Sequence, residues 1–367
     1  MEGEIYMDVL GYMGKENRKD NLDYLQLHKK LIVIDGHSDL MVDIYRRHKR
    51  SEKAIFLNKY AHELRKGGVD VIILSAGGDS GLQNFDSDDH LWVALRRIQS
   101  VYKENQESQE VVSLCTNIRD MEKAVATNKI AVFMMIEGGR ALRDDISMVE
   151  IYYRLGIRSI QLTWNGRNLI GDGCGETETN GKLTRFGKAV VKEMNRLGMV
   201  IDVAHASEST FYSVAETSDS PIIVSHANAR ALCNHVRNLT DEQIKVVAEK
   251  KGVIGICYFP VLIDLEKPSL EKILDHIDYI ANLVGIDSIS LGPDFFDYVL
   301  DLFPPILKRT EGEGTSYGDD FSLPDEIKDV TTLPNLTRGL LQRGYLEEDI
   351  GKILGNNLIR VYKEVVG

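Results

Sequence analysis

Five side chains that commonly bind metal ions follow short apolar segments at separate places in the sequence. They are His37, Asp39, Glu137, His205 and His226. Imidazole and carboxylate ligands without a thiolate suit zinc or a similar divalent ion in an open, catalytic site. His37 and Asp39 are two residues apart, so on an extended segment their side chains project to the same side and can reach one ion.

The positions of the other residues favour two Zn²⁺ ions rather than one. His205 and His226 follow consecutive expected strands, and because neighbouring strands lie about 4.8 Å apart, the two imidazoles can share a second ion. Glu137 has two oxygens, so it can bridge two ions about 3.5–4 Å apart. A water between such ions is a nucleophile near neutral pH. Asp294, if it is not itself a strong ligand, can hydrogen-bond that water and move its proton.

These residues need a fold that brings their segments together, and the sequence predicts one. Apolar, β-branched segments alternate with helical patterns, which indicates a parallel sheet with helical crossovers. Eight strands are expected at Leu31–Asp35, Val69–Ser75, Ile130–Ile136, Ile157–Leu162, Met199–Val203, Pro221–Val224, Val253–Tyr258 and Ser288–Leu291. We therefore predict an α/β fold, a (β/α)₈ TIM barrel of the metal-dependent hydrolase type, with its site at the carboxyl ends of the strands. A doubly wound sheet is disfavoured because no glycine-rich phosphate motif follows the first strand.

We expect residues 1–367 to form a single barrel domain with three additions. These are an N-terminal extension at 1–30, an insertion at 297–330 and C-terminal helices at 333–366. The net charge of −12 argues against nucleic acid and anionic membranes as partners, because both need a basic surface. The four cysteines form no CxxC pair, and we recognise neither a secretory signal nor an apolar run of about 20 residues. Reduced thiols and a cytoplasmic location are the resulting expectations.

The remaining histidines fall in expected helices or connections, and we predict that they are surface or capping groups. They are His28, His48, His62, His90, His235 and His276. Asp35 lies inside the first expected strand, so it is interpreted as a buried, hydrogen-bonded acid as readily as a functional one.

The segments around the expected site resemble those of the membrane (renal) dipeptidase family of metallopeptidases, over nearly the whole chain. The resemblance rests on Asp35-Gly36-His37-Ser38-Asp39, Glu137-Gly138-Gly139, Gly198 to His205, Pro221 to Arg230, Arg237-Asn238-Leu239, Gly292-Pro293-Asp294-Phe295, Leu333 to Thr337 and Gly344 to Ile350. It implies that His37, Asp39 and Glu137 bind one zinc ion, and that Glu137, His205 and His226 bind the other.

The resemblance also implies the activity, which is hydrolysis of the amide bond of a dipeptide by a metal-bridging hydroxide. The substrate often carries a D-residue at its C-terminal position. Glu137 and Asp294 would be catalytic, with Asp294 handling the proton. The substrate would contact Arg237, whose planar fork matches a carboxylate, together with Trp164, Asn165 and Tyr258. Relatives are often dimers, so a homodimer is expected.

The sequence departs from the family pattern around the substrate. Trp164 stands where the family has a histidine that helps to bind the substrate or the tetrahedral intermediate. Tryptophan cannot act as an acid or accept a hydrogen bond, so it donates through its indole N–H or walls the pocket. Tyr258-Phe259 reverses the usual order of these residues, and Asp297 comes one place later than the second Asp of the family's GxDFD segment.

Two alternatives stay open. The first is another binuclear amidohydrolase, such as a lactonase, a deaminase or a cyclic amidase. Many of those enzymes use a carboxylated lysine at the end of the fourth strand, where this sequence reads Gln161-Leu162-Thr163-Trp164 and has none. The second is a catalytically silent barrel that binds a ligand, and Trp164 is the feature that keeps this alternative open.

Overall fold

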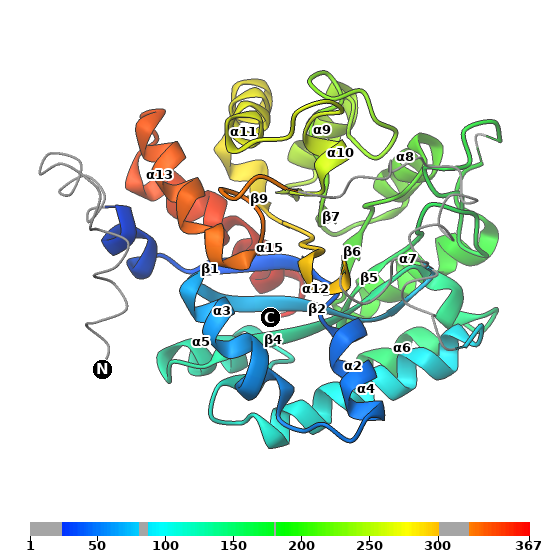
Figure 1. The fold of residues 1–367 in the computed structure, drawn as a ribbon. Coiled ribbons are helices and arrows are strands. Elements are labelled where there is room, and N and C mark those ends of the chain that lie inside the picture. Colours follow the sequence, from blue (N-terminus) through cyan, green and yellow to red (C-terminus); the bar gives the residue numbers. More distant parts are fainter. Residues whose placement is uncertain (1–23, 81–86, 180, 301–322) are drawn as a thin grey trace, which may run out of the picture.

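The chain is built on one sheet of parallel strands in a computed structural model, which describes residues 24–80, 87–179, 181–300 and 323–367. The strands are β1 (Val33–Ser38), β2 (Val69–Gly78), β3 (Val112–Leu114), β4 (Ile130–Glu137), β5 (Ile157–Gln161), β6 (Val200–Asp202), β7 (Ile222–Val224), β8 (Val253–Ile256) and β9 (Ile289–Leu291). Eight of them pair in chain order, from β1 and β2 through β4 to β9. Helices surround this sheet (Figure 1).

The two ends of the sheet approach each other closely and nearly close it into a barrel. Gly36 in β1 lies against β9, and a Cβ atom at this position would be 2.3 Å from the carbonyl oxygen of Leu291. Only glycine therefore fits where β1 meets β9. The predicted (β/α)₈ barrel is confirmed, and its eight strands overlap the eight expected segments.

Helices connect the strands and pack around the barrel. They are α2 (Met41–Lys49), α3 (Ala61–Lys66), α4 (His90–Glu107), α5 (Ile118–Ala126), α6 (Ser147–Arg154), α7 (Arg185–Leu197), α8 (Glu208–Thr217), α9 (Asp241–Glu249), α10 (Pro260–Ile263), α11 (Leu270–Val284), α12 (Asp297–Leu300), α13 (Pro334–Gln342), α14 (Glu347–Gly351) and α15 (Asn357–Val365). Thr240 and Gln243 form a capping box at the start of α9. Among the described residues, no helix has the length and apolarity needed to span a membrane.

Some elements were not expected from the sequence. β3 has only three residues and pairs with β4 outside the barrel order, so it carries too little periodicity to be recognised. At the N-terminal extension, residues 24–30 are helical and the earlier ones lie outside the described part. The expected insertion at 297–330 begins with α12, and residues 301–322 likewise lie outside the described part.

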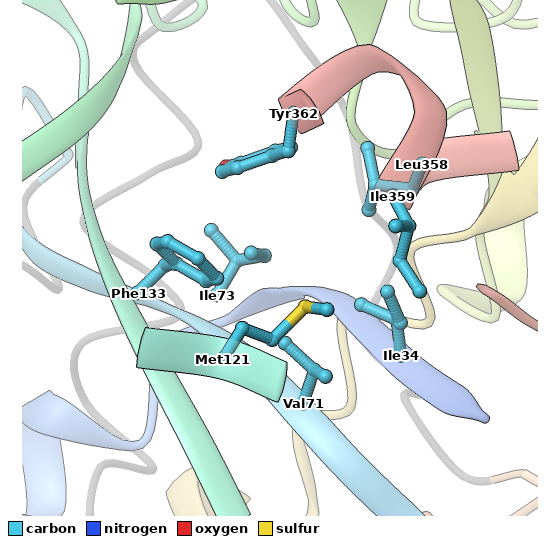
Figure 2. Close-up of a pocket in the computed structure, with 8 residues that line it drawn as sticks. All are labelled: Ile34, Val71, Ile73, Met121, Phe133, Leu358, Ile359 and Tyr362. Atoms are coloured by element: carbon cyan, nitrogen blue, oxygen red, sulfur yellow. The ribbon is translucent and has the colours of Figure 1, made fainter. Parts of the chain in front are cut away.

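The barrel interior is filled by one apolar cluster that is separate from the packing between strands and outer helices. The cluster contains every second residue of β4, namely Ala131, Phe133 and Met135. It also contains residues from five other barrel strands. Glu137 continues this alternation, so its side chain points to the same interior at the carboxyl end of β4. The cluster also includes α15, whose Tyr362 ring lies 5.1 Å from that of Phe133 (Figure 2).

The prediction that the remaining histidines are surface or capping groups is wrong for two of them. His28 is buried and bonds Thr337 Oγ1 at 2.7 Å and the carbonyl oxygen of Gly67 at 2.9 Å. His276 is buried as well and joins the carbonyl oxygen of Ile263 to the backbone N–H of Ala229. Each ring satisfies backbone groups of distant segments, which the sequence around a histidine does not reveal. All four cysteines are free and buried.

One buried carboxylate fixes the segment before α3, and it provides a pH-dependent contribution to stability. Glu104 on α4 accepts hydrogen bonds from the backbone N–H groups of Ile55 and Phe56, from Ser108 Oγ and from His48 Nε2. Burial alone would raise the pKa of Glu104, but these hydrogen bonds, led by the one from His48, outweigh it and lower the pKa.

Because the folded pKa of Glu104 lies below the unfolded value of about 4.3, its stabilisation is complete above that pH and is lost as the pH falls through the folded pKa. We expect Glu104→Gln to lower the free energy of unfolding at pH 7 by about 2 kcal/mol, since an amide NH₂ would face other donors. The difference in the free energy of unfolding between the wild type and the variant should shrink below about pH 4.3, where the glutamate of the unfolded chain becomes protonated. Urea titrations across this range would check it, and a constant difference would contradict the ionic role of Glu104.

Candidate active site

Three imidazoles converge on one carboxylate at the carboxyl end of the barrel. The Nε2 atoms of the three histidines lie close to Oε1 of Glu137, and all four side chains are buried. The distances are 3.5 Å from His37, 3.6 Å from His205 and 4.0 Å from His226. The Nε2 atoms of His205 and His226 are 2.9 Å apart. Four of the five predicted ligands therefore meet at one point, although they come from four different strands.

The two histidines that follow β6 and β7 are held by a shared buried acid. Asp202, the last residue of β6, accepts hydrogen bonds from the backbone N–H groups of Ala204 and Ser225, at 3.0 Å each. It thereby ties the segment leading to His205 to the segment leading to His226. His205 itself has a φ of 63°, a left-handed conformation that is uncommon for residues other than glycine. Such strain is concentrated at functional positions.

Hydrogen bonds on the far side of both rings direct the Nε2 atoms toward Glu137. The Nδ1 atom of His205 donates to Oδ1 of Asn165 at 2.6 Å, and Nδ1 of His226 lies 2.8 Å from Oγ of Ser225. Metal-binding histidines are usually oriented in this way by a partner on the second ring nitrogen. Asn165, expected at the substrate, is thus placed to orient a ligand. A substrate contact for it stays a prediction.

A second group of candidate ligands lies on the side of β1 and β9. His37, Asp39 and Asp294 each offer an atom within 4.8 Å of the others, and Oδ1 of Asp294 is 3.9 Å from Nε2 of His37. Asp294 has a φ of 55°, again left-handed. Asp35, inside β1, is buried and accepts a hydrogen bond from the backbone N–H of His37, which confirms its interpretation as a buried, hydrogen-bonded acid.

The site combines buried carboxylates that repel one another with neutral imidazoles, and this combination suits a bound cation. Burial, followed by the charges of Asp39 and Asp294, raises the pKa of Glu137 well above its ordinary value. Burial and then Arg237 lower the pKa of His37 to about 3, so its ring is neutral. Neither ring nitrogen of His37 has a hydrogen-bond partner within the described part of the chain, although both are buried. Neutral imidazoles beside repelling carboxylates, with both nitrogens of the His37 ring unpaired, fit a divalent metal ion.

Arg237 is a buried cation whose charge acts on these groups. It is 4% exposed, and its Nη2 atom donates to the carbonyl oxygen of His226 at 3.2 Å. Its charge acts on His37, Glu137, His205, His226 and Asp294. The predicted substrate-binding arginine therefore lies beside the metal-type ligands, where it can also attract a carboxylate.

The other two residues predicted at the substrate lie differently with respect to this centre. The Trp164 ring stacks on that of His205, with centroids 5.6 Å apart, and is 8% exposed. This position suits a wall of the pocket. Tyr258 is buried with its ring 5.3 Å from that of Phe295, and burial alone accounts for its raised pKa. No charge of a described site residue therefore contributes to the pKa of Tyr258, and its predicted contact with the substrate stays a prediction.

Two residues near the centre carried no signal in the sequence. Asp79, just after β2, donates its backbone N–H to the carbonyl oxygen of Glu137 and accepts from the backbone N–H of Arg140 and from Nδ2 of Asn168. It holds the turn that follows Glu137. Tyr298 on α12 is the second, and its buried hydroxyl has no hydrogen-bond partner among the described residues. Neither residue belongs to a motif, so only the folded chain reveals them.

The fold and the metal-type ligands at the carboxyl ends of its strands define the class of protein, a TIM-barrel metallohydrolase. The membrane dipeptidase family (peptidase family M19) matches residues 23–303 and 312–366. The chain belongs to this family, as its motifs suggested, and the prediction of an enzyme that hydrolyses dipeptides is confirmed at the level of the family.

Two relatives are similar to this chain in sequence. "Dipeptidase tcpJ" of Claviceps purpurea (strain 20.1) is 32% identical over 274 residues, which are 74% of this chain but only 58% of that protein. An uncharacterised protein in the pqqA 5' region of Klebsiella pneumoniae is 33% identical over 263 residues, covering 69% of this chain and 88% of the relative.

Solved structures show the same fold over almost the whole chain. An amidohydrolase from Pseudomonas aeruginosa has a TM-score of 0.80 at 27% identity, covering 94% of this chain and 99% of its own. A metallopeptidase from Rhodobacter sphaeroides, liganded with a phosphinate mimic of the dipeptide L-Ala-D-Ala, has a TM-score of 0.77 at 22% identity, covering 91% and 99%.

Proposed function

We propose that this protein is a zinc-dependent dipeptidase that holds two zinc ions at the mouth of its barrel. The observation that carries the proposal is the convergence of His37, His205 and His226 on Oε1 of Glu137. Glu137 would bridge the ions, with His37 and Asp39 on one side and His205 and His226 on the other. When bound, the ions would supply an activated water and stabilise negative charge on the scissile carbonyl oxygen.

The protein's own residues would orient the dipeptide. Arg237 is buried beside His226, so its guanidinium would draw the substrate's carbonyl or terminal carboxylate toward the histidines. Trp164, stacked on His205, would exclude water from that side of the pocket. A fixed, partly desolvated substrate reacts faster because the cost of orientation is met on binding.

Asp294 would carry the proton. Burial, and then the charge of Asp39, raise the pKa of Asp294 well above its ordinary value. A carboxyl group of raised proton affinity can accept a proton from the attacking water and pass it to the leaving amine. The alternative is that Asp294 is a ligand, since it groups with His37 and Asp39.

The stereochemistry of the substrate is part of the proposal. The Rhodobacter sphaeroides structure holds a mimic of L-Ala-D-Ala. We propose that this chain likewise accepts dipeptides with a C-terminal D-residue, in addition to L,L-dipeptides.

The function is tested by incubating a panel of L,L- and L,D-dipeptides with the purified enzyme, before and after metal removal, alongside metal analysis. We expect about two equivalents of zinc per chain, loss of hydrolysis with a chelator, and recovery when zinc is restored. An enzyme that binds zinc but cleaves no dipeptide would support the silent barrel. Cleavage of lactones or cyclic amides alone would support another amidohydrolase.

Two further predictions are independent of the site. A homodimer would be detected by light scattering of the purified protein. A cytoplasmic location would be checked by fractionating cells that produce the chain. Neither result bears on the chemistry proposed for the metal centre.

A further inference from the structure

The loop between β5 and α7 lies along the segment that carries His205. We call its described part, residues 162–179 and 181–184, the β5–α7 loop. The backbone N–H of Cys174 donates to the carbonyl oxygen of His205 at 2.7 Å. The backbone N–H of Ser207 donates to the carbonyl oxygen of Asp172 at 3.0 Å. These two contacts support the backbone at His205, whose left-handed φ of 63° persists only where the surroundings hold it.

The same loop also holds the imidazole ring of His205. Asn165 accepts the hydrogen bond from its Nδ1 atom at 2.6 Å, and the Trp164 ring stacks on its face at an interplanar angle of 26°. The loop is tightly packed there, because a Cβ atom at Gly173 would lie 1.9 Å from the carbonyl oxygen of Trp164. One element therefore fixes both the backbone and the ring of His205, and the direction of its Nε2 atom depends on that element.

A buried carboxylate fixes the shape of the β5–α7 loop. Asp172 is 3% exposed and accepts two hydrogen bonds from Arg167, from Nε at 2.5 Å and from Nη2 at 3.1 Å. It accepts two more, from Oγ1 of Thr179 at 2.6 Å and from the backbone N–H of Gly181 at 2.8 Å. Its own backbone N–H donates to Oγ1 of Thr210 on α8 at 3.0 Å. Asp172 thus joins both arms of the loop to the segment that follows His205.

We propose that Asp172 is a positioning residue for the zinc ion on the side of His205 and His226. The inference rests on the proposed two-zinc function and names a residue outside the ligand set that sets the affinity for one ion. Among the described residues, Asp172 belongs to none of the groups of candidate ligands, so it acts through the loop. Without its hydrogen bonds the loop loosens, and zinc must reorder His205 when it binds.

The test is Asp172→Asn, which keeps the size of the side chain and removes its charge. Metal-free wild type and variant would be titrated with zinc against a chromophoric chelator, which measures the affinity for each ion. We expect one ion to bind about 10–100-fold more weakly to the variant, as is typical when a residue that orients a ligand is changed. The other ion should bind as tightly as to the wild type, since His37 and Asp39 lie outside the loop. Excess zinc should restore the kcat for Ala-Gly.

Two further variants keep the test informative if Asp172→Asn folds poorly. Arg167→Gln is milder, because the Arg167 side chain is 53% exposed and its loss leaves Asp172 bonded to Thr179 and Gly181. It should weaken the same ion by a smaller factor. Asn165→Ala removes the partner of the His205 ring directly. Combined with either change, it should leave one ion tightly bound, because both changes act on the same ion.

Glu104→Gln is the matched control, because Glu104 is also a buried carboxylate with four hydrogen bonds, on α4. It should lower the free energy of unfolding and change the affinity for neither ion. Equal weakening of both ions by Asp172→Asn, weakening of neither, or loss of both tight ions in the combined variant would overturn the inference. If the wild type binds no zinc, the proposed function fails, and the inference falls with it.

Discussion

Glu137→Gln is expected to lose bound metal and dipeptide hydrolysis together. The Oε1 atom of Glu137 is the point on which three imidazoles converge, and the second oxygen allows the side chain to bridge two ions. Glutamine has nearly the same shape but no charge, and its NH₂ group repels a cation. Mutation of a residue that only orients a metal ligand typically lowers metal affinity or activity about 10–100-fold. Glu137 is itself the bridging ligand, so its loss should lower kcat/KM further, by more than roughly 10³-fold.

Metal content and kcat/KM would be measured on the same preparation of Glu137→Gln. Glu104→Gln is the matched control, since Glu104 is also a buried glutamate that accepts several hydrogen bonds, but it belongs to a different group of side chains, with His48 and Glu107, and not to the group around Glu137. It should keep its zinc and its activity at 25 °C while losing stability. A Glu137→Gln enzyme that retains two zinc ions and near-normal turnover would contradict the bridging role.

Asp294→Asn should separate metal binding from turnover. If Asp294 moves the proton, the variant keeps both zinc ions while kcat falls by about 10²–10⁴-fold, the usual contribution of a general acid or base. Asparagine is the right replacement because Asp294 has a φ of 55°, which asparagine tolerates better than most residues do. An alanine variant would add backbone strain to the chemical change.

Two results would contradict the role of Asp294 in different ways. Full activity of Asp294→Asn would exclude it as the proton carrier. Loss of one zinc ion would instead identify it as a ligand, in the group with His37 and Asp39. Metal analysis and a kcat measurement on the same sample distinguish the two.

The alternation of segments along the chain was enough to predict the barrel. Each strand is a short, buried, β-branched segment, and helix starts such as Thr240 and stops such as Gly198 are local signals. Because barrel enzymes use the carboxyl ends of their strands, the expected position of His37, Glu137, His205 and His226 at one rim followed from their place in the sequence.

Elements whose form depends on distant partners were missed. β3 is held by its pairing with β4, and His28 and His276 are buried by segments far away in the chain. Their own sequences contain neither a period nor a cap that would reveal these contacts. Tertiary contacts, rather than propensity, decide such short or isolated features.

The sequence by itself determined the kind of fold and the residue types at the mouth of the barrel, since hydrophobic periodicity and motif spacing are written along the chain. Only the tertiary structure decided the direction and partner of each side chain. Barrel closure at Gly36 and the curvature of the sheet bring together groups that are more than a hundred residues apart. For this reason three features became visible only in the folded chain. They are the hydrogen bond from the His205 ring to Asn165, the hydrogen bond from the backbone N–H of Ser225 to Asp202, and the unpaired hydroxyl of Tyr298 among the described residues.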